Sequence, residues 1–307
     1  MTVTAESEQP RPAQGVAFSD AVTFAFGDPA ADVYGIARVG LSPGEDGDPQ
    51  GSGLAMLFSG REPVAVRAAG GIPVGTADWA AVDAAGVRTT TVEPLSTWTI
   101  AFQSEDGTTS FDLRFEALSD PAVIDADGEA ARVGGMEGYE QLCHVTGSAQ
   151  VRGGRRRVDC FGQRGHSWGA PDWDRVALAR TIGVWIDPEH AVTLTAIRPS
   201  GSKRTHADEA IAASVFSAPP EGAERSVPVT VEDPRVTTTM DEEERQRRAG
   251  LELWIDPDGY PLRVAGEVLC GTSLDLGRLR LDCAFFHWTM DGRHGVGRYD
   301  ILRRVAP

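Results

Sequence analysis

The stretch GQRGHSWGAPDWD, residues 162–174, places a histidine, an arginine, two tryptophans and two carboxylates between three glycines and a proline. A turn that only reverses the chain is rich in Gly, Asn and Ser and carries little aromatic mass. Aromatic rings beside titratable groups supply what a small-molecule site needs, an apolar surface next to a proton donor. The stretch therefore predicts a functional site. The structural alternative is a barrel corner with a packed tryptophan and a histidine that caps a carbonyl.

Short β-rich runs, separated by Gly, Pro and Asp, dominate the chain outside this stretch. This spacing is typical of an antiparallel sandwich or barrel. The runs cover residues 21–26, 33–39, 54–58, 64–68, 87–92, 97–102 and 110–117. Helical signal is scarce: one short helix is expected within residues 77–85, and residues 241–248 form a charged segment without an apolar face. The sequence predicts an all-β fold with little helix.

A short internal repeat suggests two similar β-domains. The run GRRRVDC at residues 154–160 recurs as GRLRLDC at residues 277–283, with five of seven positions identical, and an aromatic and histidine cluster follows each copy. Residues 1–20 are polar and lack the apolar region of a secretory signal, so they are expected to form a disordered lead-in. The predicted domains span residues 21–178 and 179–307.

A two-residue turn at residues 153–154 is predicted to close a hairpin around the first copy of the repeat. Under this register Gln141 lies opposite His166, and Tyr139 lies opposite Trp168. The inward face then carries polar and aromatic side chains that would line a cavity instead of forming a dry core: Tyr139, Gln141, Arg164, His166 and Trp168. A β-bulge at one of the nearby glycines would flip this alternation.

Composition and motifs exclude several classes of function. The net charge of −16 argues against nucleic acid or an anionic membrane as partner. No run approaches the roughly 18 consecutive apolar residues of a membrane span, so a cytoplasmic protein is expected. The four cysteines form no C-x-x-C pair and are predicted to be free thiols. Nucleotide-binding, nucleophile-elbow and metal-ligand spacings are missing from the sequence, so neither a cofactor nor a metal is expected.

Several motifs together resemble the hydroxyneurosporene synthase/AttH-like family, which includes carotenoid 1,2-hydratases. They are YEQ at residues 139–141, VTG at 145–147, the central GQRGHSWG followed by Asp-Trp, and the closing segment 286–303. The resemblance implies two packed, lipocalin-like antiparallel β-barrels with a hydrophobic pocket near their junction. It also implies either hydration of an isolated double bond through protonation, or guided cycloaddition of a polyene.

Asp172, His166 and Arg164 are the candidate catalytic residues. A carboxyl against a tryptophan can stay protonated because burial disfavours its charged form, so Asp172 beside Trp173 is the candidate acid. The alternative for Asp172 is an Asx cap of the following turn. His166 is expected to share the proton or hold a water, or else to be a hydrogen-bonded barrel histidine. Pairing of Arg164 with Asp172 would lower the carboxyl pKa and undermine the acid role.

The candidate substrate-binding residues are mainly aromatic, and their π faces can stabilise developing positive charge. They are Trp168, Trp173, Tyr139, Gln141, His287 and Trp288, and the alternative for the tryptophans is core packing. The sequence thus predicts a cofactor-free hydratase, isomerase or cyclase that acts on a hydrophobic terpenoid, polyene or polyketide. The alternative is a lipocalin-like carrier without chemistry. A homodimer is left open.

Overall fold

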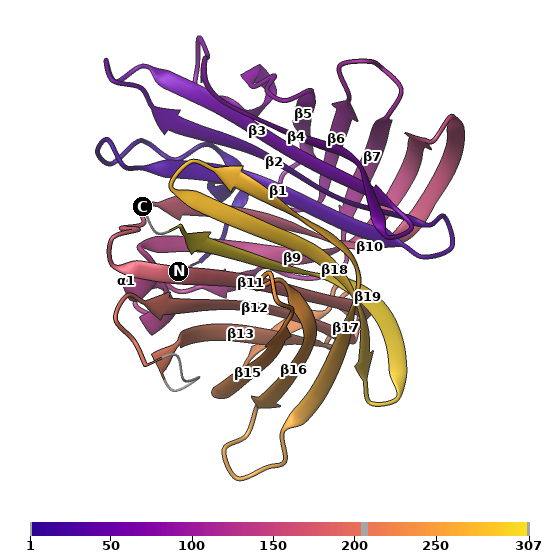
Figure 1. The fold of residues 1–307 in the computed structure, drawn as a ribbon. Helices are drawn as coiled ribbons and strands as arrows, with labels where there is room; N and C mark the ends of the chain where they lie inside the picture. The colour runs from indigo at the N-terminus through magenta and orange to yellow at the C-terminus, as the bar shows by residue number, and fades with distance from the viewer. Residues whose placement is uncertain (1, 204–207, 306–307) are drawn as a thin grey trace. The chain divides into compact units, whose positions relative to one another are not determined.

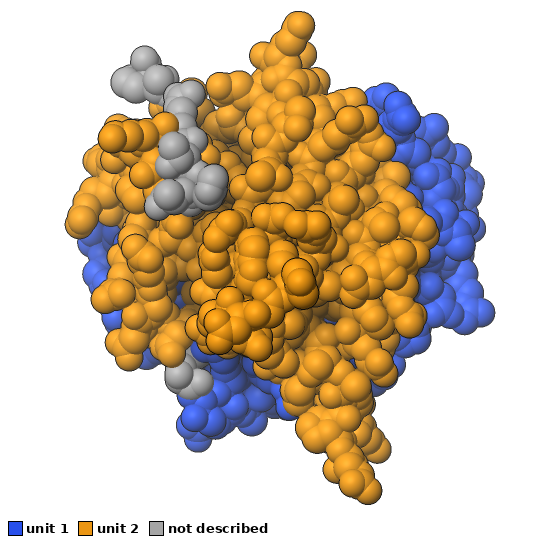
Figure 2. Space-filling view, turned by 90° about the horizontal axis from the view of Figure 1, so that it is seen from below, with its two compact units in different colours: residues 1–123, 136–171 blue, residues 124–135, 172–307 orange. Residues whose placement is uncertain are grey.

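The computed structural model describes residues 2–203 and 208–305. The chain forms two compact units, which Figure 2 distinguishes by colour. Unit 1 comprises Met1–Val123 and Met136–Pro171, and unit 2 comprises Ile124–Gly135 and Asp172–Pro307. The division at residue 171 precedes the boundary expected at residue 178, and a short segment of the N-terminal half belongs to unit 2. Within the described ranges, no helix has the length and apolar character needed to cross a membrane.

Unit 1 is built on one antiparallel sheet whose strand order is β4-β3-β2-β1-β10-β9-β7-β6-β5, with β8 paired to β9 (Figure 1). Its strands are β1 (Ser19–Asp28), β2 (Val33–Pro43), β3 (Pro49–Ser59), β4 (Glu62–Pro73), β5 (Val87–Glu93), β6 (Thr97–Gln103), β7 (Ser110–Ala117), β8 (Ala122–Ile124), β9 (Met136–Val151) and β10 (Gly154–Gly169). Two single turns of 3-10 helix, η1 (Ala5–Glu8) and η2 (Trp79–Ala81), precede β1 and β5. The helix expected at residues 77–85 is thus reduced to η2.

Unit 2 repeats this arrangement in a nine-stranded sheet of order β14-β13-β12-β11-β19-β18-β17-β16-β15. Its elements are α1 (Glu129–Gly134), β11 (Val176–Asp187), β12 (His190–Pro199), β13 (Ala210–Ser217), β14 (Val227–Thr230), β15 (Asp233–Met240), β16 (Gln246–Trp254), β17 (Leu262–Leu276), β18 (Leu279–Met290) and β19 (Arg293–Arg304). The predicted all-β fold, with two curled antiparallel sheets and little helix, is confirmed.

The two sheets share their strand order, but the sequence repeat does not join equivalent strands. The copy at residues 154–160 begins β10, which lies next to β1. The copy at residues 277–283 leads into β18, which occupies the place of β9. The similarity of the units therefore lies in their topology, and the seven-residue match marks the tips of two hairpins that differ in position.

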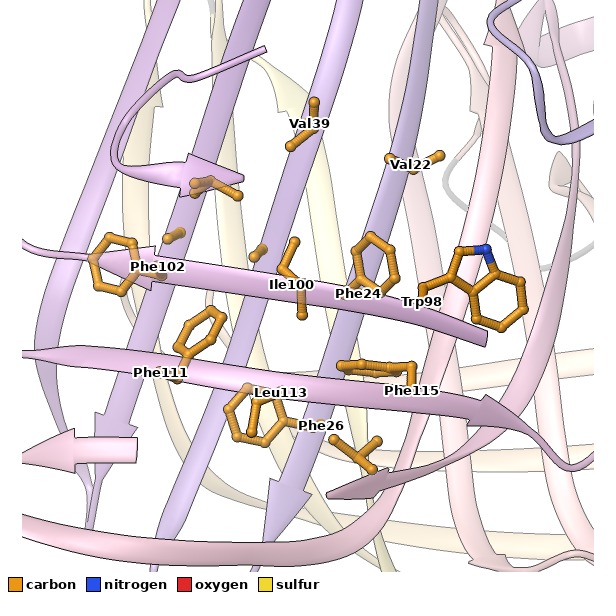
Figure 3. Close-up of a cluster of buried hydrophobic side chains, with 14 of the residues drawn as sticks. Val22, Phe24, Phe26, Val39, Trp98, Ile100, Phe102, Phe111, Leu113 and Phe115 are labelled. Atoms are coloured by element: carbon orange, nitrogen blue, oxygen red, sulfur yellow. The ribbon is translucent and has the colours of Figure 1, made fainter. Parts of the chain in front are cut away.

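Alternation of apolar and polar residues explains how the core of unit 1 forms. Along β7, Phe111, Leu113 and Phe115 point inward and are buried, because successive side chains of a strand face opposite sides of the sheet. Figure 3 shows them packed against residues of β1 and β6. The ring of Phe115 lies edge-on to Phe24, with 5.1 Å between centroids. Each such ring contributes about 1.5–3 kcal/mol through burial.

The β9–β10 hairpin differs in register from the sequence prediction by two residues. Its turn is Arg152-Gly153, with φ of 50° and 76°, the left-handed conformation that a two-residue hairpin turn requires. The predicted pairings are therefore wrong: Tyr139 lies opposite His166, and Gln141 lies opposite Arg164. Because the shift is an even number of residues, every side chain keeps its predicted face. Pairing is unbroken from residue 154 to residue 169, without a bulge.

The register also determines which residues lie opposite the two cysteines of this hairpin. Cys143 lies opposite Gly162, and Cys160 lies opposite Val145. All four cysteines are free, as the sequence predicted.

The segment expected to be a disordered lead-in is folded in the structure. Its η1 helix is followed by an exposed run at residues 12–17 and then by β1, which begins at Ser19. Ser7 and Glu8 are buried, and Glu8 is hydrogen-bonded to side chains of three strands. The polar composition that suggested disorder reflects a segment that supplies counter-charge to the interior of unit 1.

Candidate functional site

The inward face of unit 1 carries a buried polar cluster next to its apolar core. The strand register places it there, because directly paired residues share a face. On β10, Arg164 lies between Gln141 of β9 and Phe24 of β1, and His166 lies between Tyr139 and Val22. The cluster consists of six buried residues, Glu8, Asp20, Tyr139, Gln141, Arg164 and His166.

His166 and Asp20 form a hydrogen-bonded pair inside this cluster. His166 Nε2 lies 2.7 Å from Asp20 Oδ1, and both side chains are at most 2% exposed. Asp20 Oδ2 accepts a second bond from the backbone N–H of Arg11 at 2.6 Å. Since a carboxylate only accepts, His166 Nε2 carries the proton and Nδ1 keeps its lone pair in the neutral ring. Nδ1 has no hydrogen-bond partner among the described residues.

The protonation state of His166 follows from its surroundings. Burial lowers its pKa below the ordinary value of 6.5, the hydrogen bond from Nε2 to Asp20 opposes that effect, and the charge of Arg164 adds to it. The rings of Trp79, Tyr139 and Trp168 surround the imidazole edge-on, with centroids 5.0–5.6 Å away. The imidazole is therefore neutral at neutral pH, and Nδ1 is a base in an aromatic environment.

Arg164 is paired with Glu8 at the other side of the cluster. Its Nη2 donates to Glu8 Oε2 at 2.8 Å, and both side chains are 1% exposed. The guanidinium also lies over the rings of Trp98 and Tyr139, with Cζ 4.9 and 5.2 Å from the centroids. Tyr139 O–H donates to Glu8 Oε1 at 2.7 Å. Burial raises the pKa of Tyr139 well above its ordinary value, so the hydroxyl stays protonated and remains a donor.

Gln141 and Trp168 support this arrangement in different ways. The Gln141 side-chain N–H groups donate to the backbone carbonyls of Leu95 and Ser119, at 3.2 and 3.0 Å, so they hold two loops against β9. Trp168 is 6% exposed and packs edge-on to His166, while the guanidinium of Arg11 lies 4.2 Å above its ring. The structure therefore brings both predicted residues to the buried polar cluster.

Asp172 does not fit the role of a buried acid. Its side chain is exposed, and Oδ1 accepts the backbone N–H of Asp174 at 3.0 Å. This is the Asx turn that the sequence offered as the alternative. The alternative in which Arg164 pairs with Asp172 does not describe the structure either, because Arg164 pairs with Glu8. The neighbouring Trp173 is half-buried and does not enclose the carboxyl.

His287 and Trp288 lie in unit 2 and point to opposite faces of β18. Trp288 is fully buried in the core of that unit, where it stacks on Phe286 with 5.3 Å between centroids. His287 is exposed and stacks on His294 across the hairpin. Neighbouring residues of a strand cannot line one surface together. Core packing accounts for Trp288.

Comparison with known proteins assigns the chain to a family. The family model of DUF7064, a domain of unknown function, matches residues 3–305. The chain belongs to the DUF7064 family. No curated protein sequence matches this chain.

Solved structures share the fold of this DUF7064 chain. A Nitrosomonas europaea protein assigned to AttH superposes with a TM-score of 0.64 at 12% identity, over 94% of this chain and 92% of that chain. Kievitone hydratase from Nectria haematococca gives 0.63 at 13%, over 97% and 91%. CghA with bound Sch210972 gives 0.57 at 11%, over 94% and 88%. The predicted resemblance to AttH-like proteins is thus confirmed for the fold. The pocket expected at the barrel junction stays a prediction.

Sequence reasoning missed four residues of the site, Glu8, Asp20, Trp79 and Trp98. Trp79 Nε1 donates to the backbone carbonyl of Glu8 at 2.7 Å, and Trp98 Nε1 donates to Glu8 Oε2 at 2.9 Å. One signal was present: an arginine and a histidine on an inward face need buried acids nearby. That requirement does not say which of the chain's 45 acidic residues supplies them.

Proposed function

We propose that the chain is a cofactor-free enzyme that acts on a hydrophobic, unsaturated small molecule by hydration, isomerisation or cyclisation. The observation that carries this proposal is the buried His166–Asp20 pair beside the donors of Arg164 and Tyr139. A titratable pair and fixed donors inside an apolar barrel are typical of a catalytic site. The hydratase activity in the name of one structural neighbour, and the small molecule bound by another, support the same class.

The proposed base is His166. In its neutral form Nδ1 takes a proton from water or from a carbon next to a carbonyl, and Asp20 stabilises the imidazolium that forms. The geometry for this role is the 2.7 Å bond between His166 Nε2 and Asp20 Oδ1, which orients the ring. In this proposal His166 is the group that transfers the proton, and Asp172, which is exposed, has no catalytic role.

Arg164 and Tyr139 are proposed to stabilise the negative charge that develops on a carbonyl oxygen. In a hydration, the hydroxyl of the deprotonated water adds to the β-carbon and the electron pair moves to the carbonyl oxygen. The proton on His166 then returns to the α-carbon, so that one water has been added and the base is regenerated. In an isomerisation, the proton is removed from one carbon and returned to another.

The apolar residues around the polar cluster favour a hydrophobic substrate. Phe24 lies directly opposite Arg164 in the sheet, and the rings of Trp98 and Trp168 complete the surroundings of the polar groups. Apolar walls with few fixed polar groups are typical of small-molecule sites. Terpenoids, polyenes and polyketides are the substrate classes we propose, and the cytoplasm is the compartment we expect.

A carrier without chemistry is the competing function. The observation that favours it is that the ionisable groups already pair with one another, Arg164 with Glu8 and His166 with Asp20. Pairs of this kind also occur as purely structural elements of a protein interior.

Native mass spectrometry of the full chain, incubated in D2O with a metabolite extract of the producing organism, separates these functions. The proteins compared are wild type, His166→Gln and, as a matched control, the exposed Asp172→Asn. Wild type and the control are expected to release a product heavier by one water or an isomer that carries deuterium. His166→Gln is expected to retain the precursor. The same unchanged ligand on all three proteins would show that the enzyme proposal is wrong and favour the carrier.

A further inference from the structure

Glu8 is bound by the sheet of unit 1 in the manner of a ligand. Three side-chain donors from three strands converge on its carboxylate: Trp98 of β6 at 2.9 Å, Tyr139 of β9 at 2.7 Å and Arg164 of β10 at 2.8 Å. All three donors belong to the sheet, whereas the acceptor comes from η1, outside it. The sheet therefore holds a set of donors arranged for a carboxylate that it does not itself supply.

The segment that carries Glu8 packs against the sheet through Val3 and through Arg11, which lies over Trp168, but the described residues show no strand pairing between the two. Residues 12–17, which connect it to β1, are exposed and form neither helix nor strand. Its other bonds are the Trp79 N–H to the Glu8 carbonyl, the Tyr139 O–H to the Ser7 carbonyl at 3.4 Å, and the Arg11 N–H to Asp20. None of these is a strand pairing. Departure of the segment would leave every ladder of the sheet intact.

Arg164 has more donors than Glu8 uses. Only Nη2 is bonded to the carboxylate, while Nε and Nη1 have no hydrogen-bond acceptor among the described residues, although the side chain is 1% exposed. A guanidinium binds a free carboxylate preferentially through two parallel N–H groups. Glu8 meets the guanidinium at Nη2 alone. A free carboxylate is able to engage Nε or Nη1 as well.

We propose that Arg164, Tyr139 and Trp98 form a binding site for the carboxylate of a hydrophobic organic acid, and that Glu8 occupies it as an internal competitor. The apolar part of the acid lies toward Phe24 and Phe115, which form the adjoining core. This inference names the ligand class of the site described above, and in that respect it rests on the proposed function. Binding of the acid requires the segment around Glu8 to leave.

The first test is rescue of the full-length Glu8→Ala variant by propionate, which reproduces the lost carboxylate. Saturating propionate is expected to raise the Tm of this variant by about 3–8 °C, because a ligand that binds only the folded state stabilises it. Propionamide at the same concentration and NaCl at the same ionic strength are expected to give no such shift. The matched control is Glu6→Ala, which removes an exposed glutamate of the same helix.

The second test uses the wild-type chain and needs no variant to fold. Hydrogen exchange of residues 2–11 is measured with dodecanoate and with dodecanamide, which differ only in the head group. Dodecanoate is expected to accelerate exchange in this segment at least tenfold without affecting β9 and β10. Dodecanamide is expected to leave the segment protected.

Either of two results overturns the proposal. One is a Tm shift that propionamide or NaCl reproduces, or that wild type and Glu6→Ala share. The other is equal exchange of residues 2–11 with the acid and the amide. Failure of the proposed function is a separate result, because that function is tested by measuring turnover. If propionate but not propionamide rescues Glu8→Ala and no turnover is found, the protein binds an organic acid without converting it, as a carrier does.

Discussion

Both units bury an arginine, a glutamate and a tyrosine in sheets of the same strand order, but the glutamate comes from different places. In unit 2, Glu209 immediately precedes β13 and pairs with Arg180 of β11 at 3.1 Å and with Arg198 of β12, whose Nε lies 2.8 Å away. The hydroxyl of Tyr299 lies 2.6 Å from Thr238 Oγ1 and does not bond to the acid. The network of unit 2 thus joins strand residues to an acid that directly adjoins β13.

In unit 1 the equivalent acid, Glu8, lies on a segment that takes no part in the sheet. Its carboxylate is held by one arginine and two neutral donors, Tyr139 and Trp98. Glu209 is held by arginines of two neighbouring strands and directly adjoins a third strand, so we expect its ion pairs to stabilise the fold. The Glu8–Arg164 ion pair can separate while the sheet stays folded, because Glu8 lies on a segment outside the sheet. This difference supports our proposal that the site lies in unit 1.

The largest expected effect comes from removing the two glutamates in turn. Glu209→Ala leaves the buried Arg180 and the half-buried Arg198 without their acid and is expected to lower the free energy of unfolding by about 3–5 kcal/mol. Glu8→Ala is expected to cost about 1–3 kcal/mol, because the segment can open and let water reach Arg164. Urea denaturation of both variants measures the two costs. Equal losses would remove the distinction between the units.

A second prediction concerns pH. Burial lowers the pKa of His166, so between that value and about 6.5 the unfolded state binds more protons than the folded state. The stabilising effect of the neutral ring is therefore fully present above about pH 6.5 and is lost as the pH falls through the folded pKa. Unfolding free energies measured from pH 8 to 5 should fall less steeply for His166→Gln than for wild type. His294→Gln, which removes an exposed histidine of unit 2, should keep the wild-type slope.

The third prediction compares Tyr139 of unit 1 with Tyr299 of unit 2, and the expected changes in unfolding free energy are smaller. Burial raises the pKa of both, so each is a neutral donor or acceptor in its network. Tyr139→Phe and Tyr299→Phe are each expected to cost about 0.5–1.5 kcal/mol of unfolding free energy. Only Tyr139→Phe should also accelerate hydrogen exchange in residues 2–11, since its hydroxyl binds Glu8. Faster exchange of that segment in Tyr299→Phe would contradict the division of roles.

The smallest effect is expected at Asp172. Its side chain is exposed and caps a turn, so Asp172→Asn, which keeps an oxygen for the Asp174 N–H, should change the unfolding free energy by less than about 0.5 kcal/mol. Turnover of the substrate should also be unchanged. Loss of turnover in this variant would return the acid role to Asp172.

Local pattern predicted the fold and the faces of several residues in the candidate cluster. Alternation along residues such as Phe111, Leu113 and Phe115 was sufficient to place β7 and its inward face. The same alternation put Arg164 and His166 on an inward face despite the error in register, because that error was an even number of residues.

The rest of the site depended on contacts that local pattern does not encode. Arg164 meets Glu8 across 156 positions, and His166 meets Asp20 across 146. Asp172 shows the opposite case: it is adjacent to Trp173 in the sequence, but its side chain is exposed. Residues adjacent in sequence can differ in burial at a turn, and residues far apart in sequence can be in contact within a sheet.

Asp20 divides its carboxylate between the two parts of the site: Oδ1 holds His166, and Oδ2 holds the backbone of Arg11 in the N-terminal segment. An opening of the segment would hydrate this carboxylate and the imidazole beside it, which relieves the burial that depresses the His166 pKa. Whatever change in the His166 pKa the opening produces, protonation of His166 changes the opening equilibrium by the same factor. The single carboxylate of Asp20 couples the position of the N-terminal segment to the basicity of His166.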